Sequence, residues 1–376
     1  MRIRVDLILF LLLAALSGCT SKKTLVNKLK FSSENIVVPG VDFPAKFGGY
    51  NYTWFSFDQD SLLKLHYVID DTLLQSFSLD GKFNDFFPLP KSAHNYGFNT
   101  QNVGKKLFYF SFPGNLYEYS DGSFKLILSR EHMTRLKKDG LDINLNFDFG
   151  NYSRIYKDSF LIVPLTAGLE PNLKYSDLFS KYPLFAKVHI PSGRVEYLHY
   201  FTPVHYLRYD HYLNHTARFT LAGDELLIHY PYKEVVERYS LSQNKVIGEC
   251  EFRSYYQEEE IKSLSTGDQA DHKKKARYQI EAGHYASLVY NPYKKHYYRV
   301  FYHPLDELTG NGEYTIASDK RCSVAVFDSQ FRFLGEYLLP RHFSFIMGVT
   351  PIPQGFIINS SAKRSKKGLK LMRINY

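Results

Sequence analysis

Residues 222–244 read AGDELLIHYPYKEVVERYSLSQN and contain one complete unit of the pattern that determines the fold. The unit begins with the tight turn Ala222-Gly223-Asp224, continues with the apolar strand Glu225–Tyr230, and ends at the hairpin turn Ser242-Gln243-Asn244. Glycine, asparagine and aspartate favour the short loops that join antiparallel strands. The stretch therefore predicts consecutive antiparallel strands joined by hairpins.

The same unit recurs along the chain. Comparable turns are centred on Gln59, Val103, Asp158, Gly223, Pro292 and Gln354, which lie 44, 55, 65, 69 and 62 residues apart. The other apolar or aromatic strands that follow these turns are Leu62–Tyr67, Lys106–Phe112, Phe160–Leu165, His296–Tyr302 and Phe356–Asn359. The spacing accommodates four strands per unit, with longer loops from the third unit onward.

The last unit is incomplete, because only the strand Leu369–Tyr376 follows Gly368. The segment Lys30–Pro39 precedes the first unit and has no hairpin of its own. Pairing these two segments would close a ring and protect its edges. The sequence thus predicts an all-β fold, a six-bladed β-propeller closed by an N-terminal strand in the last blade. A seventh blade would need four strands within 253–283, which is too charged.

Composition agrees with a chain built of strands. The 31 Tyr and 30 Phe residues far outnumber the single Trp and four Met, and aromatic side chains favour the pleated, half-buried surface of a sheet. The best helical periodicity is in Arg130–Lys138 and Gln257–Leu264, both polar. We expect at most short helices between groups of strands.

The N-terminus has the features of an export signal. Arg2 and Arg4 precede the apolar run Leu7–Leu16, which is shorter than the roughly 20 residues of a membrane-spanning helix. We predict a lipoprotein signal peptide over 1–18, a lipidated cysteine and tether over 19–29, and a propeller domain over 30–376. The alternative is a buried N-terminal helix with an incidental cysteine.

Two resemblances support this interpretation. The ending Leu16-Ser17-Gly18-Cys19 resembles the lipobox of bacterial lipoproteins, which implies cleavage before Cys19 and attachment of fatty acyl chains such as palmitate to that residue. With the aromatic strands and the repeat, the chain resembles Gram-negative lipoproteins of the domain-of-unknown-function 4221 type, and more broadly TolB-like six-bladed propellers. These resemblances imply an envelope protein, lipid-anchored in the outer membrane or another envelope membrane and facing the periplasm. They bring no catalytic residues.

The net charge of +9 makes an anionic partner worth considering. Basic clusters occur at Lys22-Lys23, His272–Lys275 and Lys363–Lys370, and such clusters are usually solvated faces. The first lies close to Cys19 and could rest on anionic lipid headgroups. We expect no nucleic acid partner for an exported protein.

Two cysteines remain besides Cys19. Cys250 and Cys322 are 72 residues apart, and we expect separate buried strand residues, with a disulfide between them as the alternative.

The starts of the first strands are the candidate binding site, because these strands line the channel of a propeller. These starts contain Tyr, Asn, His and Arg but no acidic residue. The candidate ligand-binding residues are Tyr96, Tyr152, Arg154, His215, Arg218 and His284. The two guanidinium groups could bind a carboxylate or phosphate. The alternative is that these side chains satisfy only the channel's own backbone and waters.

Residues 199–215 are rich in histidine. His199, His205, His211 and His215, with His229 on the next strand, match no known spacing of metal ligands. We therefore expect an aromatic surface loop, and neither a metal nor another cofactor.

No enzyme motif supplies a nucleophile, acid or base: G-x-S-x-G, H-E-x-x-H, Cys-x-x-Cys and the P-loop are absent. We predict a non-enzymatic protein that binds a polar or anionic small molecule or glycan, or an envelope protein. The alternative is a propeller hydrolase or lyase acting on an envelope sugar or lactone.

Overall fold

The structure is a computed structural model, in which a part of the chain is described. The described residues are 27–38, 54–57, 63–69, 73–77, 83–90, 98–103, 106–111, 115–129, 131, 141–143, 153–167, 182–203, 217–257, 261, 264, 268, 271–305, 315–316, 319–341, 346–360 and 369–376. Residues 1–26 lie outside these ranges, so the signal peptide, Cys19 and the domain boundaries at 18 and 29 stay predictions.

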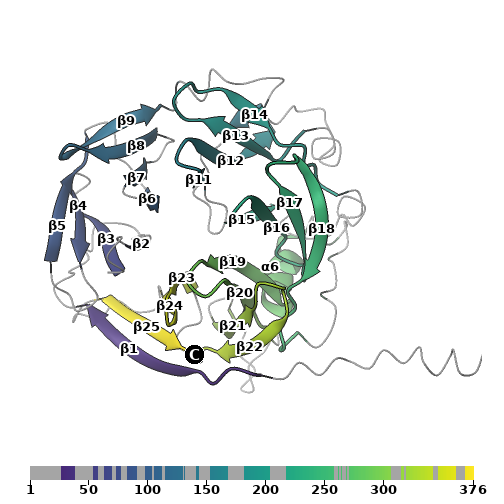
Figure 1. Cartoon of the computed structure of the whole chain (residues 1–376). Helices are drawn as coiled ribbons and strands as arrows, with labels where there is room; N and C mark the ends of the chain where they lie inside the picture. The colour runs from purple at the N-terminus through teal and green to yellow at the C-terminus, as the bar shows by residue number, and fades with distance from the viewer. Residues whose placement is uncertain are drawn as a thin grey trace, which may run out of the picture.

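Antiparallel sheets are arranged in a ring around a central axis (Figure 1). Within the described ranges, five of them are four-stranded blades. The first two contain β2 (Trp54–Phe57), β3 (Leu63–Ile69), β4 (Leu73–Phe77) and β5 (Phe83–Pro88), then β6 (Phe98–Val103), β7 (Lys106–Ser111), β8 (Asn115–Ser120) and β9 (Ser123–Leu128). Two more contain β15 (Arg218–Ala222), β16 (Glu225–His229), β17 (Val235–Ser240) and β18 (Lys245–Glu251), then β19 (His284–Asn291), β20 (His296–Tyr302), β21 (Cys322–Phe327) and β22 (Phe333–Leu338).

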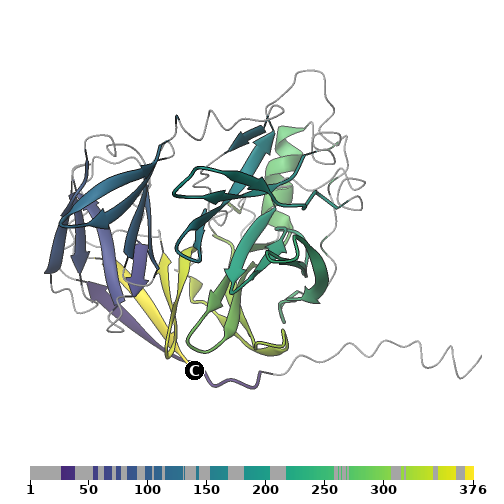
Figure 2. The ribbon, with the colours of Figure 1, turned by 45° about the horizontal axis from the view of Figure 1, so that its top comes forward.

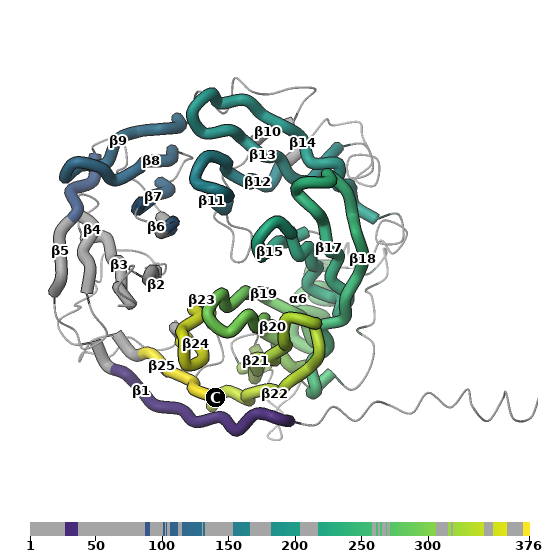
Figure 3. The backbone as a smooth tube through the Cα atoms, viewed as in Figure 1, coloured from purple at the N-terminus to yellow at the C-terminus, as the bar shows by residue number. Residues whose placement is uncertain are grey.

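The fifth blade, which we call the closing blade, joins the two ends of the described chain. It contains β23 (Ile346–Ile352), β24 (Gly355–Ser360), β25 (Leu369–Asn375) and β1 (Ser32–Val38). β1 runs antiparallel to β25 from the pair Ser32–Asn375 to the pair Val38–Leu369. The predicted pairing of the N-terminal segment with the last strand is therefore confirmed, and the path of the backbone shows it clearly (Figure 3).

The remaining sheet does not repeat the four-stranded pattern. It contains β10 (Leu141–Ile143), β11 (Arg154–Tyr156), β12 (Phe160–Ala167), β13 (Phe185–His189) and β14 (Val195–Tyr197). β12 is eight residues long, so β11 pairs with its first part and β10 with its last part. The prediction of a six-bladed propeller is therefore wrong: the described residues form five four-stranded blades, and this irregular five-stranded sheet takes the remaining place in the ring.

Side chains on the innermost strands connect successive sheets. Gln101 of β6 donates from Nε2 to the carbonyl oxygen of Ser153 (2.6 Å) and accepts from the backbone N–H of Ile155 (3.0 Å). Thr220 of β15 donates to the carbonyl oxygen of Leu288 in β19, and Asn291 of β19 donates to that of Ile352 in β23 (2.9 Å). Each such bond contributes about 1 kcal/mol. The ring is thus held together at its centre by bonds from side chains to backbone.

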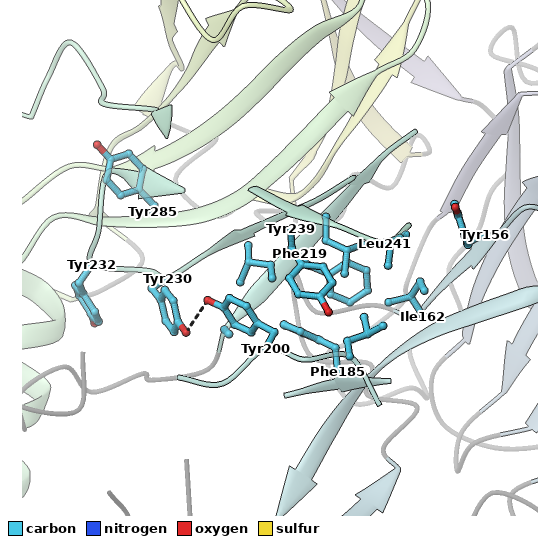
Figure 4. Close-up of a cluster of buried hydrophobic side chains, with 14 of the residues drawn as sticks. Tyr156, Ile162, Phe185, Tyr200, Phe219, Tyr230, Tyr232, Tyr239, Leu241 and Tyr285 are labelled. Atoms are coloured by element: carbon cyan, nitrogen blue, oxygen red, sulfur yellow. Dashed lines mark hydrogen bonds between the residues drawn. The ribbon is translucent and has the colours of Figure 1, made fainter. Parts of the chain in front are cut away.

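Aromatic side chains fill the space between the β10–β14 sheet and the β15–β18 blade (Figure 4). The rings of Phe185 and Phe219 meet edge to face, with centroids 5.2 Å apart. Tyr200 and Tyr230, on opposite sides of this boundary, share a hydrogen bond of 3.2 Å between their hydroxyls. Edge-to-face pairs add about 1 kcal/mol beyond the burial of their area. The high Tyr and Phe content therefore serves the contacts between sheets.

One helix, α6 (His272–Glu281), precedes β19 and stands beside the ring (Figure 2). It begins because the side chain of Asp271 accepts from the backbone N–H groups of Lys273 and Lys274. No helix in the described ranges has the length and apolarity needed to cross a membrane. Most of the two predicted helices, Arg130–Lys138 and Gln257–Leu264, lies outside those ranges.

Cys250 and Cys322 are not bridged. The expectation of two separate strand residues is confirmed, but the expected burial is found only for Cys322 in β21, since Cys250 in β18 is partly buried. Burial raises the pKa of each thiol to about 12, which keeps both thiols protonated near neutral pH.

The closing blade gives a test of the fold. A Cβ atom at Gly355 would overlap the carbonyl oxygen of Ile374 in β25. We expect Gly355→Ala to lower the free energy of unfolding by about 3 kcal/mol, as overpacking against backbone does. Gly122→Ala is the control, because open space surrounds that position and only its positive φ of 78° costs about 1 kcal/mol. Equal losses in urea unfolding would contradict the described closing blade.

Candidate functional site

The two faces of the ring carry different connections. We call one of them the linker face. On this face the innermost strand of each four-stranded blade begins, the second strand ends and the third strand begins. In the β19–β22 blade this face carries His284, Tyr302 and Lys320. On the opposite face, the hairpin face, lie turns such as 292–295 between β19 and β20. Side chains from different blades can converge on the linker face near the centre of the ring.

Three of the predicted site residues are described, and all three stand at starts of inner strands on the linker face. Arg154 begins β11, Arg218 begins β15 and His284 begins β19. Tyr96, Tyr152 and His215 lie outside the described residues. The guanidinium of Arg154 is half-buried and contacts the carbonyl oxygen of Ser153 at 3.4 Å.

The structure brings Arg218 and His284 together, because β15 and β19 are neighbouring inner strands. Arg218 donates from Nη1 to the carbonyl oxygen of Ala286 (2.6 Å), two residues beyond His284. This bond joins two blades, so Arg218 has a structural role whatever else it binds. Its charge also acts on the neighbouring imidazole, whose pKa is lowered to about 3 by burial first, then by Lys320 and Arg218.

Lys320 completes this group, and the sequence did not indicate it. Its side chain donates to the carbonyl oxygen of Ala282, and Nζ lies 3.4 Å from Nδ1 of His284. The residue is 1% exposed, and burial lowers the pKa of its amine to about 7. Within the described part of the chain no carboxylate contacts Nζ. Burying a cation without a countercharge is costly, which is why the proton is held weakly.

Aromatic rings flank His284. His284 stacks on Tyr302, with ring centroids 4.9 Å apart and planes 14° apart. Tyr232, from the turn between β16 and β17, lies 6.0 Å from His284 and also packs against Tyr278 of α6. We call Arg218, His284 and Lys320, with Tyr232 and Tyr302, the basic cluster. It combines nitrogen donors with aromatic faces at the boundary of two blades.

A second polar group involves the same blade. Ser323 contacts Nε2 of His303 (2.8 Å) and donates to Glu336, which also accepts from Ser254 (2.7 Å) and from the backbone N–H of Tyr255 (2.6 Å). Burial raises the pKa of Glu336. In a nucleophilic triad the histidine stands between the serine and the acid, but here the serine is in the middle and fully buried. We assign this group to stabilising the blade.

The histidine-rich stretch is described only in part. His199 stacks edge to face on Phe201 and its backbone N–H donates to Asn244, while His229 is buried in β16. His205, His211 and His215 lie outside the described residues. Among the residues with described positions, no group of three or more His, Cys, Asp and Glu side chains could hold a metal ion.

A ring of antiparallel blades, with polar side chains at the starts of its inner strands, defines a β-propeller. The profile of a domain of unknown function, DUF4221, matches residues 96–338. The chain belongs to this DUF4221 family. The predicted family resemblance is therefore confirmed, while lipoprotein character and a likeness to TolB-type propellers are not part of that finding.

One solved structure of the same family supports the fold. A crystal structure of a DUF4221 family member from Bacteroides vulgatus superposes with a TM-score of 0.68 and 15% identity, covering 93% of this chain and 99% of that one. BamB from Moraxella catarrhalis gives a TM-score of 0.35 and 10% identity, covering 86% of this chain and 82% of that one. No curated protein matches this chain. The family relation and the fold are thus shown.

The buried amine of Lys320 makes the stability of the fold depend on pH. Because the pKa of Lys320 is about 7 in the fold and 10.5 ordinarily, the unfolded chain holds the proton more tightly. Stability is thus lost as pH falls from 10.5 toward 7. We expect the unfolding free energy of the wild type to rise by about 2 kcal/mol relative to Lys320→Met between pH 7 and 9. Urea unfolding at both pH values measures this, and parallel changes in the two proteins would contradict it.

Proposed function

We propose that this protein is a lipid-anchored propeller of the cell envelope that binds an anionic ligand at the basic cluster and performs no reaction on it. The observation that carries the proposal is the environment of Lys320. Its buried Nζ meets the carbonyl oxygen of Ala282 and the ring of His284, and no carboxylate within the described residues. A ligand carboxylate or phosphate would supply the negative charge that the described residues do not place at Nζ.

The chemistry of the cluster suits such a ligand. Charge-assisted hydrogen bonds from an ammonium to a carboxylate or phosphate are roughly twice as strong as neutral ones. Tyr302 and Tyr232 are buried and pack beside His284, which holds its imidazole in place next to Lys320. An acidic sugar or another anionic glycan fragment is a candidate because its carboxylate could accept from the ammonium of Lys320.

Proton uptake should accompany binding. In the free protein, burial and the neighbouring charges lower the pKa of both Lys320 and His284. An anion beside them would favour the protonated forms and raise both pKa values. Binding should therefore be tighter at pH 6 than at pH 8.

The envelope location rests on the N-terminal sequence. Arg2, Arg4, the apolar run Leu7–Leu16 and the Leu16–Cys19 ending support export and acylation of Cys19. A protein placed there would meet envelope glycans and other envelope proteins. The competing proposal is that the protein is a scaffold that binds another envelope protein at its blade rims, in place of a small ligand.

Ligand binding can be measured by calorimetry and by thermal shift with D-glucuronate, inorganic phosphate and, as a neutral comparison, D-glucose. We expect glucuronate to bind more tightly than glucose, with at least a tenfold weaker affinity in Lys320→Met. Lys245→Met is the matched control, because that lysine is exposed on β18.

Two results would contradict this proposal. If the wild type and Lys320→Met bound glucuronate and phosphate with equal affinity, the basic cluster would not be the binding site. Stabilisation by calcium that a chelator reverses would favour the hydrolase or lyase alternative, since a hard cation needs several oxygen ligands.

A further inference from the structure

The first described residues do more than lead into β1. We call Asn27–Phe31 the N-terminal strap, because it lies along β22, the outer strand of the neighbouring blade. The backbone N–H of Lys28 donates to the carbonyl oxygen of Leu334 (2.7 Å), and that of Glu336 donates to the side chain of Asn27 (2.9 Å). The chain thus contacts the β19–β22 blade before it enters the closing blade.

Close packing fixes the strap at this position. A Cβ at Gly335 would stand 3.2 Å from the ring of Phe31 and 3.3 Å from Leu29, so the strap lies directly on that glycine. The ring of Phe31 also lies 5.6 Å from those of both Tyr337 and Tyr376. The exit point of the N-terminus is therefore an ordered site on the outer rim.

The distance from this site to Cys19 is short. Eight residue steps separate Cys19 from Asn27, which span at most about 29 Å when extended. A compact domain of this length has a radius of gyration of about 20 Å, hence a width of about 50 Å. A lipid on Cys19 would keep the rim at the strap near the bilayer, with the β6–β9 blade on the far side of the ring (Figure 1).

Side chains at this rim suit a membrane surface. Lys28 and Lys30 of the strap are exposed, as are Tyr293 and Lys295 in the turn between β19 and β20. The turn is adjacent to the strap, because Lys294 donates from Nζ to the carbonyl oxygen of Tyr376, whose ring meets Phe31. Tyrosine gathers at membrane interfaces, and lysine is attracted to anionic headgroups.

We propose that the strap and the 292–295 turn form the surface that rests on an anionic lipid membrane. The inference depends on the proposed lipid anchor at Cys19, and it adds an orientation. The rim of the β19–β22 blade faces the bilayer, and the second blade points away from it.

Fluorescence quenching tests the orientation in the full chain reconstituted into vesicles of phosphatidylglycerol and phosphatidylethanolamine. A probe is placed at Gln330→Cys, in the hairpin between β21 and β22, or at Ser123→Cys, at the start of β9; both positions are exposed. Cys250→Ser is included in both, to remove the partly buried thiol. Headgroup quenchers should reduce emission at least threefold more at position 330 than at 123. Equal quenching would overturn the inference.

Mass spectrometry of the N-terminal peptide separates the two proposals. If Cys19 carries acyl chains, the quenching result by itself tests the proposed orientation. If it carries none, the proposed anchor fails, and co-sedimentation of the chain with the same vesicles tests whether the strap and the 292–295 turn bind the membrane.

Reversing Lys28, Lys30 and Lys295 to Glu should then weaken binding at least tenfold. Reversing the exposed Lys245, Lys273 and Lys274 is the matched control, and an equal effect of both triples would overturn the inference.

Discussion

The pairing of β1 with β25 is the constraint on which the rest of the structure depends. Without it the last three strands would end in an open edge, and the ring would have two free ends. The N-terminal strap extends this closure onto β22, since Asn27 and Lys28 bond to the neighbouring blade. The same segment that closes the ring would carry the lipid, so closure of the fold and the proposed orientation at the membrane have one structural origin.

Contacts near the centre of the ring indicate what its basic residues do. At the centre, Gln101, Thr220 and Asn291 bond the inner strand of one sheet to the backbone of the next. Arg218 takes part in the same way through Ala286. The sequence allows two roles for these side chains, binding a ligand or bonding the channel's own backbone, and the structure leaves room for both. Arg218 serves the fold, and Lys320 beside His284 is the group whose charge the described residues leave unbalanced.

Local signals explain which parts of the fold could be predicted. The turn 222–224 and the aromatic run His296–Tyr302 combine turn chemistry with an apolar run, and both were located correctly, the latter as β20. β10 has only three residues, too few for any period, and its pairing depends on the length of β12. The helix α6 was not predicted, because the basic residues His272–Lys275 at its start indicate only a solvated face, and its N-cap Asp271 is known from the structure. Lys320 lies 36 positions from His284, so only the fold could bring them together.

The most direct measurement is amide hydrogen exchange at Ile155, whose N–H is bonded to the side chain of Gln101 between two sheets far from the termini. The comparison is between a chain starting at residue 27 and one starting at residue 39, which lacks the strap and β1. If closure holds the whole ring, removal of β1 will speed exchange at Ile155 at least tenfold as well as in β25. Faster exchange confined to β25, with Ile155 unchanged, would contradict the account.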